Sequence, residues 1–230
     1  MKKNRIKEKL RTGEPVFGVS VMIPSPQIVE MIGAAGFDWV LLDCEHGTLT
    51  LESVELMAMA AEAAGITAIA RPATRSPGHI LQVLDRGVMG VQVPHVNTAA
   101  EAREVIAAVK FHPLGKRGLA AGTRAAAYDS HGGLADYVKA ANDATLIAIQ
   151  LEDRPAIDNI DELLKVENID VFFIGPSDLS QAMGHPGNPK APEVAEAIAG
   201  SFRKIFRQSG SPDLIGVAKR IQRAGVALIG

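Results

Sequence analysis

Cysteine is nearly absent from this 230-residue sequence, since Cys44 is the only one. A single cysteine cannot form a disulfide within the chain, so a disulfide-stabilised scaffold is excluded and a reducing cytoplasm is the expected location. No window of 18 apolar residues occurs, and the basic start at residues 1–5 is not followed by the apolar run of a signal peptide. We therefore predict a cytoplasmic protein with no membrane partner.

Charge of either sign is not in excess, because 24 lysine and arginine residues stand against 26 aspartate and glutamate residues. No block of like charge occurs after the first dozen residues, so a nucleic-acid partner is not indicated. Aromatic residues are few, whereas alanine, glycine, valine and isoleucine are common. This composition suits helices packed tightly on a sheet, and the length suffices for one α/β barrel.

One pattern recurs along the chain, namely an apolar strand, a polar turn, a helix and a glycine. Helix starts are indicated by Ser25-Pro26, by Ser76-Pro77 and by a capping box from Thr98 to Glu101. We predict helices at 2–10 and 192–208, an irregular stretch at 111–142, and strands at 16–23, 39–42, 66–70, 88–93, 146–151, 171–174, 214–216 and 226–229. About eight such units predict an α/β fold in which residues 1–230 form a single (β/α)8 TIM barrel.

Two details of this barrel follow from the pattern. The helix after Ser25 is expected to bury one face, made of Ile28, Met31, Ile32 and Ala35. The eighth strand is expected at 226–229, which leaves the barrel without its last helix and exposes an apolar flank. We expect the chain to be cut short there, or the flank to be covered by another subunit of a homo-oligomer.

Polar residues follow five successive predicted strands. In a barrel of this kind the carboxyl ends of the strands converge on one rim, where catalytic sites are found. The second to sixth strands lead into Asp43, Glu45 and His46; Arg71; His95; Gln150 and Glu152; and Asp178, respectively. Stability alone gives little reason for this placement, so the sequence favours an enzyme over a scaffold.

The stretch from Trp39 to Gly47 ends a strongly apolar run with Asp43, Glu45 and His46. His46 could act as a general base held by Asp43, since a neighbouring carboxylate fixes the tautomer and tunes the pKa of an imidazole. The alternative is a polar turn in which Asp43 is a local cap and His46 bonds to the backbone. Cys44 alternates to the other side of the strand from Asp43, which disfavours a thiol nucleophile.

Glu152 and Asp178 form the best pair for a hard divalent cation, because such ions prefer carboxylate oxygens. Two carboxylates make a sparse site, so substrate oxygens would have to complete it. The alternative is that Glu152 pairs with Arg154 while Asp178 caps the turn after Pro176. Arg71 could bind a substrate carboxylate with its planar fork or only neutralise neighbouring acids.

The sequence gives little support for a phosphate-binding loop or for a Schiff-base lysine. The turn from Gly115 to Gly118, with Lys116 and Arg117, matches a phosphate-binding loop only weakly, because it does not open a helix directly after a strand. A Schiff-base mechanism needs a lysine near the mouth of the barrel. The second to sixth strands and the short turns that leave them contain none, so that mechanism is disfavoured.

Several motifs together resemble the metal-dependent pyruvate aldolases of the HpcH/HpaI type, such as 4-hydroxy-2-oxoheptanedioate and 2-dehydro-3-deoxyglucarate aldolases. The match covers about residues 10–200 in order and spacing. Its motifs are Leu42-Asp43-Cys44-Glu45-His46-Gly47, Ala70-Arg71-Pro72, the turn at 113–118, Gln150-Leu151-Glu152-Asp153 and Gly175-Pro176-Ser177-Asp178-Leu179-Ser180. Leu151 and Asp153 depart modestly from it, since the family more often has isoleucine and threonine there.

The resemblance implies a role for each matching residue. Glu152 and Asp178 would hold Mg²⁺ or Mn²⁺, with Co²⁺ also accepted, and pyruvate would chelate the metal. Arg71 and Gln150 would orient the pyruvate. The segment with Gly175, Ser177 and Asp178 would bind substrate as well. His46, supported by Asp43 and Asp85, would manage the aldol proton.

The function implied by the resemblance is that of a class II aldehyde-lyase in aromatic or sugar-acid catabolism. Such an enzyme cleaves 4-hydroxy-2-oxo acids to pyruvate and an aldehyde, and runs the reverse addition, through a metal-stabilised pyruvate enolate. Its partners would be these small molecules and further copies of itself in a trimer or hexamer. Two alternatives stay open: a citramalyl or malyl thioester lyase, and a non-catalytic truncated barrel that serves as a binding module.

Overall fold

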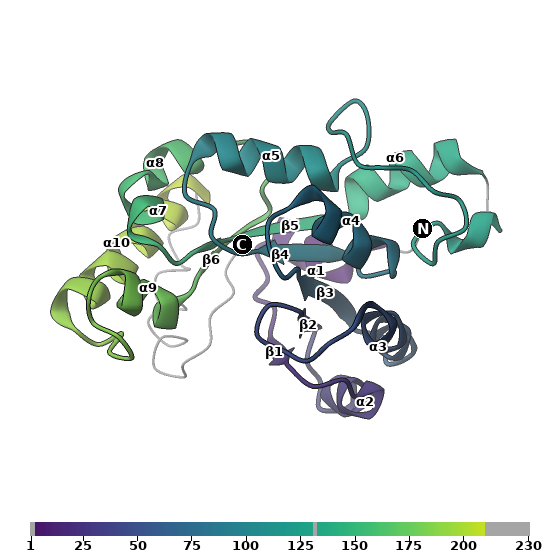
Figure 1. The fold of residues 1–230 in the computed structure, drawn as a ribbon, viewed down its shortest axis with the longest axis horizontal. Coiled ribbons are helices and arrows are strands. Elements are labelled where there is room, and N and C mark those ends of the chain that lie inside the picture. The colour runs from purple at the N-terminus through teal and green to yellow at the C-terminus, as the bar shows by residue number, and fades with distance from the viewer. Residues whose placement is uncertain (1–2, 131–132, 210–230) are drawn as a thin grey trace. The chain divides into compact units, whose positions relative to one another are not determined.

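The computed structural model of the chain describes residues 3–130 and 133–209 (Figure 1). The fold is α/β, with six parallel strands that lie in the sheet in their sequence order, β1 to β6, and with helices between them. This confirms the predicted fold class and the first six strands. The predicted strands at 214–216 and 226–229 lie outside the described residues, so closure into a (β/α)8 barrel stays a prediction.

The residues group into two compact units. Of the described residues, the first unit comprises 3–93, 104–130 and 133–147, and the second comprises 94–103 and 148–209. The first unit contains α1 (Arg5–Arg11), β1 (Gly18–Val21), α2 (Pro26–Ala34), β2 (Trp39–Asp43), α3 (Leu51–Ala63), β3 (Thr67–Arg71), α4 (Pro77–Asp85), β4 (Gly90–Val93), a 3-10 turn (Ala127–Asp129) and α6 (Leu134–Ala144). The second contains α7 (Arg154–Asp158), α8 (Ile160–Leu163), β6 (Val171–Ile174), α9 (Pro176–Ala182) and α10 (Pro192–Ser209), while α5 (Ala99–Val109) and β5 (Leu146–Leu151) have residues in both.

Strand β2 of the first unit is buried along its whole length, as β4 is. All five of its residues are buried, as expected for a parallel strand that is covered on both faces. It pairs in parallel with β1 on one side and with β3 on the other. The register with β3 sets Asp43 opposite Arg71, so the two strands end in an acid and a base at the same level. In the second unit, β5 and β6 pair in parallel and set Gln150 opposite Phe173.

The predicted helix starts are confirmed. The side chains of Ser25, Thr50 and Ser76 cap the first turns of α2, α3 and α4. The capping box before α5 is present, because Glu101 accepts from the backbone N–H of Thr98, whose hydroxyl accepts from the N–H of Glu101.

The predicted inner face of α2 is partly wrong. Met31 is 68% exposed, whereas Val29 and Ile32 are buried. Met31 therefore lies outside the buried face of this nine-residue helix. That face is formed by Val29 and Ile32, which lie about one turn apart.

The stretch predicted to be irregular from 111 to 142 is shorter than expected, because α6 begins at Leu134. Phe111, Tyr137 and Ala141 pack in one buried cluster, which gives this helix an inner face. Arg117 lies over the Phe111 ring, 4.7 Å from its centroid, and donates to Asp85 at 2.8 Å. The turn at 113–118 therefore anchors this segment by a buried ion pair.

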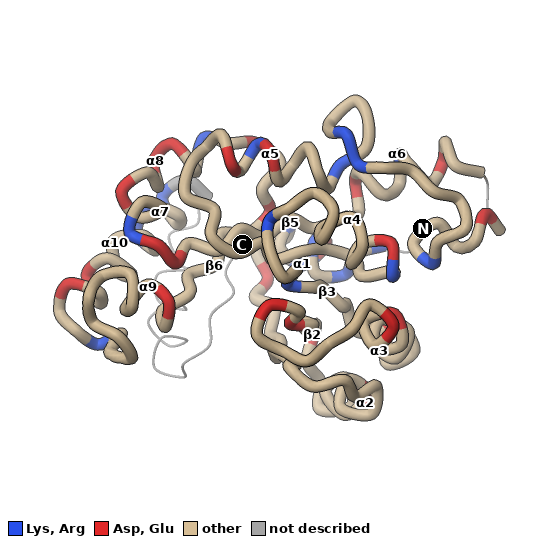
Figure 2. The backbone as a smooth tube through the Cα atoms, viewed as in Figure 1, with Lys and Arg blue, Asp and Glu red and all other residues tan. Residues whose placement is uncertain are grey.

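Charged residues of both signs are scattered along both units rather than gathered in a run, as Figure 2 shows. Within the described part of the chain, no helix is long and apolar enough to cross a membrane. The scattered charges agree with the balanced charge of the sequence, and the helices agree with its lack of an 18-residue apolar window.

Asn4 connects helix α1 to the core of the first unit and provides a test of stability. Its side-chain oxygen caps α1, and its amide donates to the carbonyls of Met89 and Ala144, each at 2.9 Å. We expect Asn4→Ala to lower the free energy of unfolding by about 3 kcal/mol, because a cap and two buried hydrogen bonds are lost together. Urea unfolding followed by circular dichroism measures this.

Ser25→Ala is the matched control, since it removes only a helix cap. The expected loss there is about 1 kcal/mol. Equal losses in the two variants would contradict the role assigned to the Asn4 amide.

Candidate functional site

Asp43 is the centre of the first cluster, which consists of Asp43, Glu45, His46 and Arg71 in the first unit. The strand ends at Asp43, which is 1% exposed. Its Oδ1 accepts the backbone N–H groups of Glu45 and His46 at 3.0 and 3.2 Å, so it closes the turn that follows. Gly47 is required in this turn, because a Cβ there would lie 2.2 Å from the carbonyl oxygen of Asp43.

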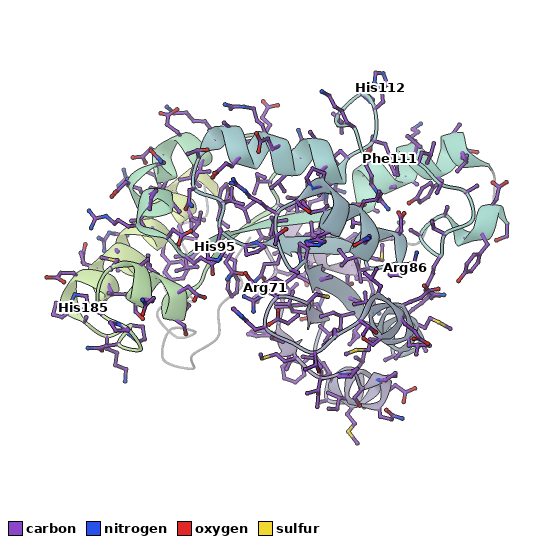
Figure 3. All side chains as sticks on the ribbon, in the orientation of Figure 1. Arg71, Arg86, His95, Phe111, His112 and His185 are labelled. Atoms are coloured by element: carbon purple, nitrogen blue, oxygen red, sulfur yellow. The ribbon has the colours of Figure 1, made fainter. Side chains whose placement is uncertain are left out.

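Arg71, labelled in Figure 3, lies between two carboxylates. Its Nε donates to Asp43 Oδ1 at 2.9 Å and its Nη2 to Asp43 Oδ2, while Glu45 Oε2 lies 3.3 Å from Nε. Burial alone would raise the pKa of Asp43, but the hydrogen bonds and charge of Arg71 and the two turn N–H groups outweigh burial and lower it. Asp43 is therefore held as a carboxylate that fixes the guanidinium plane.

His46 has a different environment from the one predicted for a base held by Asp43. Asp43 bonds to the backbone N–H of His46, as in the cap alternative, while the imidazole Nε2 lies 3.9 Å from Glu45 Oε2. The side chain is 51% exposed, so it is open to solutes. Asp85 ends α4 and accepts from Arg117 at 2.8 Å, so its described partner is Arg117.

Cys44 follows Asp43 and has an unreactive environment. Burial raises the pKa of its thiol to about 11, and the charge of Asp43 contributes to the rise. Because the thiolate is the reactive form of cysteine, the raised pKa agrees with the prediction that Cys44 is not a nucleophile.

Alkylation of Cys44 tests this environment. At pH 8 a thiol with a pKa of about 11 has about 100-fold less thiolate than one with a pKa of about 9. We therefore expect iodoacetamide to react with the folded protein at least 100-fold more slowly than with the protein in guanidinium chloride. Mass spectrometry of quenched samples gives both rates, and similar rates would contradict the assignment.

Glu152 is the centre of the second cluster, which lies in the second unit and contains Glu152, Gln150, His95, Gly175 and Asp178. Glu152 is 1% exposed at the end of β5. Its Oε1 accepts the backbone N–H of His95 at 2.9 Å, and its Oε2 accepts from the side-chain amide of Gln150. Burial raises the pKa of Glu152 and the charge of Asp178 adds to the rise, although both hydrogen bonds act against it.

These residues suit a divalent cation. Glu152 and Asp178 are two carboxylates close enough to repel, and none of the lysines or arginines in the described residues pairs with either. The one ion-pair contact of Glu152 among the described residues is with His95, whose Nδ1 lies 3.5 Å from Oε1. A carboxylate buried to this extent is costly without a permanent positive charge beside it, and a hard cation would offset that cost. No set of three histidine, cysteine or acidic side chains with metal-site geometry occurs in the described ranges, so other ligands would have to be substrate oxygens or water.

The alternative roles for this pair are wrong in the structure. Arg154 pairs with Asp158 at 2.9 Å within α7 instead of with Glu152. Asp178 lies in the first turn of α9, but the cap position is Gly175 and no side chain caps that helix.

Gly175 and Ser177, predicted to bind substrate, lie on either side of Pro176. Ser177 is exposed. Gly175 is buried against Glu152 and Gln150, since a Cβ there would lie 2.8 Å from Glu152 Oε2 and 3.1 Å from the amide nitrogen of Gln150. Only glycine fits without displacing one of them.

Gly175→Ala tests this packing. We expect it to weaken Mn²⁺ binding by about 10-fold to 100-fold, the usual cost of disturbing groups that orient a metal ligand. Isothermal titration calorimetry with Mn²⁺ alone measures the change. Gly200→Ala is the control in the same unit, because a Cβ there has only an ordinary 3.6 Å neighbour within α10. Equal effects would show that the alanine acts through general destabilisation.

Lysines that are buried in the described residues lie elsewhere. Lys110 donates to the carbonyls of Asn142 and Thr145, and Lys7 lies 3.5 Å from the carbonyl of Thr145. Thr145 directly precedes β5, so both amines lie at the amino end of that strand. They are not placed for a Schiff base at its carboxyl end, in agreement with the sequence.

The sequence missed the part that His95 plays. It follows β4 with φ of 53° and contacts both Glu152 and Asp153. The only sign of this role in the sequence was the position of His95 after a predicted strand. The predicted convergence of the two clusters on one rim stays a prediction.

Comparison with known proteins identifies the family. The family model described as HpcH/HpaI aldolase/citrate lyase matches residues 17–221. A hydroxypyruvate/pyruvate aldolase of Sagittula stellata is 36% identical over 203 residues, which cover 88% of this chain and 79% of the relative. A 2-keto-3-deoxy-L-rhamnonate aldolase of Escherichia coli is 36% identical over 215 residues, with 94% and 80% covered.

A solved structure agrees with these relatives. The crystal structure of an HpcH/HpaI aldolase from Desulfitobacterium hafniense superimposes with a TM-score of 0.80 at 30% identity. The match covers 92% of this chain and 78% of that one. The family model, the relatives and this structure agree over most of the sequence. The chain therefore belongs to the HpcH/HpaI aldolase/citrate lyase family.

Proposed function

We propose that this protein is a divalent-metal-dependent aldolase that cleaves 4-hydroxy-2-oxo acids to pyruvate and an aldehyde, and catalyses the reverse addition. Its membership of the family and the names of its relatives, both aldolases, support a carbon–carbon lyase. The observation that carries the proposal is the buried carboxylate of Glu152, which lies beside Asp178 without a lysine or arginine partner among the described residues. A cation site is the simplest reason for such an arrangement.

Glu152 and Asp178 are assigned to hold the cation, Mg²⁺ or Mn²⁺. Their oxygens are hard donors, which such ions prefer over nitrogen or sulfur. When bound, the ion supplies Lewis-acid stabilisation of the negative charge that carbon–carbon cleavage leaves on the pyruvate half. Gln150, which donates to Glu152, keeps that carboxylate in place.

Arg71 is assigned to the carboxylate of the substrate. Asp43 already fixes the plane of its guanidinium through two hydrogen bonds, and this pre-organisation reduces the entropy lost on binding. His46 is assigned to move the proton of the hydroxyl group, because its imidazole is half exposed and imidazoles are the commonest general acids and bases in enzymes. Asp43 supports His46 by fixing its backbone.

The assignment of Glu152 predicts a strict metal requirement. We expect pyruvate release from a panel of 4-hydroxy-2-oxo acids to stop with EDTA and to return with Mg²⁺, Mn²⁺ or Co²⁺. Glu152→Gln and Asp178→Asn should each lower kcat/KM by at least about 100-fold, because they remove charge that the cation needs. Coupled lactate dehydrogenase measures pyruvate, and calorimetry with Mn²⁺ gives the affinity.

Glu162→Gln is the matched control, because Glu162 is an exposed acid of the same unit that pairs with Lys165. It should leave both measurements unchanged. Activity that survives EDTA and both substitutions would sink the metal assignment. Inactivity towards the oxo acids, with cleavage of citramalyl or malyl thioesters, would instead place the protein with thioester lyases.

A further inference from the structure

His95 has a left-handed backbone. It lies two residues after the end of β4 with φ of 53°, in a region that few residues other than glycine adopt, although asparagine, aspartate and histidine do so more often than the rest. In this conformation its N–H lies 2.9 Å from Glu152 Oε1 and donates to it. His95, labelled in Figure 3, is therefore a residue with a left-handed backbone whose N–H binds the buried carboxylate of Glu152.

The imidazole of His95 is held in turn. Its Nδ1 lies 2.9 Å from Asp153 Oδ2, and because an ionised carboxylate only accepts, Nδ1 is the donor. The side-chain amide of Asn97 donates to the same oxygen at 3.1 Å, and that of Asn159 donates to the carbonyl of Asn97 at 3.1 Å. These contacts connect the loop after β4 to the residues that follow β5.

We propose that His95 is a positioning residue, whose left-handed backbone aims its N–H at Glu152 and so presents that carboxylate to the cation. The inference rests on the proposed function and adds a residue to it. Among the described residues one hydrogen-bond donor binds each oxygen of Glu152, the N–H of His95 at Oε1 and the amide of Gln150 at Oε2. The imidazole Nδ1 of His95 lies 3.5 Å from Oε1 and donates to Asp153 instead. A carboxylate oxygen has two lone-pair directions, so each oxygen keeps one for a cation while the side chain cannot rotate.

The backbone conformation, rather than the imidazole alone, is the part that matters. Glycine reaches the left-handed region without cost, and asparagine reaches it more easily than most residues. A β-branched residue is a genuine outlier there and would rotate the peptide to another region. The chemistry of the side chain and the direction of the N–H can therefore be separated by substitution.

The experiment compares His95→Gly, His95→Asn and His95→Val in the full-length protein. Calorimetry with Mn²⁺ alone, without substrate, measures the affinity. We expect the glycine and asparagine variants to stay within about threefold of wild type and the valine variant to bind at least about tenfold more weakly. Steady-state kinetics should then show the valine variant rescued in part by higher Mn²⁺ concentrations.

Asn168→Val is the matched control for backbone strain. Asn168 has φ of 66°, is exposed and lies in the same unit, between α8 and β6. Asn168→Val should lower the unfolding temperature about as much as His95→Val does, without changing the affinity for Mn²⁺. If the valine variant at position 95 does not fold, His95→Ala takes its place, with a smaller loss expected in the same direction.

The outcomes separate the inference from the proposed function. Wild-type affinity in His95→Val, together with loss of binding in Glu152→Gln, would overturn the role of His95 and leave the metal assignment standing. Equal losses in the glycine, asparagine and valine variants would also overturn it, because the imidazole would then be the essential part. No Mn²⁺ binding by the wild type, or unchanged binding by Glu152→Gln, would overturn both.

Discussion

Burial of a carboxylate is the constraint on which both clusters depend, and the two clusters meet it in opposite ways. Asp43 and Glu152 are each 1% exposed at the end of a parallel strand. Arg71 compensates Asp43 within the chain, so the pKa of Asp43 is lowered despite its burial and the charged form is favoured. Glu152 has two amide donors, His95 and an acidic neighbour instead of an arginine, and its pKa is raised by burial and by Asp178. The same residue chemistry thus gives an internal ion pair in one place and, in the proposed function, a cation site in the other.

Backbone geometry positions these charges as much as side chains do. Only glycine fits at positions 47 and 175, because a Cβ would clash with the carbonyl oxygen of Asp43 at Gly47 and with the carboxylate of Glu152 at Gly175. His95 reaches Glu152 through its N–H, and the turn after β2 reaches Asp43 in the same way. Such donors cannot rotate away, which is the basis of electrostatic pre-organisation. The loops after the strands therefore act as rigid supports.

The first six strands and the helix caps could be predicted from the sequence, because hydrophobic periodicity and capping chemistry are local. The choice of Glu152 as a metal ligand stays a prediction. Strands β5 and β6 were predicted with the bounds that the structure has. The exposed Met31 could not be foreseen, since a nine-residue apolar helix leaves its phase ambiguous and packing decides it. The pairing of Asp85 with Arg117 joins residues 32 positions apart, and the contact of the His95 imidazole with Asp153 joins residues 58 positions apart. Such long-range contacts leave no mark in local patterns.

The raised pKa of Glu152 also connects the site to the stability of the fold. A carboxyl whose folded pKa lies above its unfolded value binds a proton more tightly in the native state. Its contribution to stability is therefore fully present below the unfolded pKa and falls as the pH rises towards the folded one. At neutral pH the native state bears this cost, and under the proposed function a cation that binds only the native state would offset it by mass action. The proton and the metal would then compete for one carboxylate, so the charge that lowers the stability of the metal-free protein would be the charge that binds the metal.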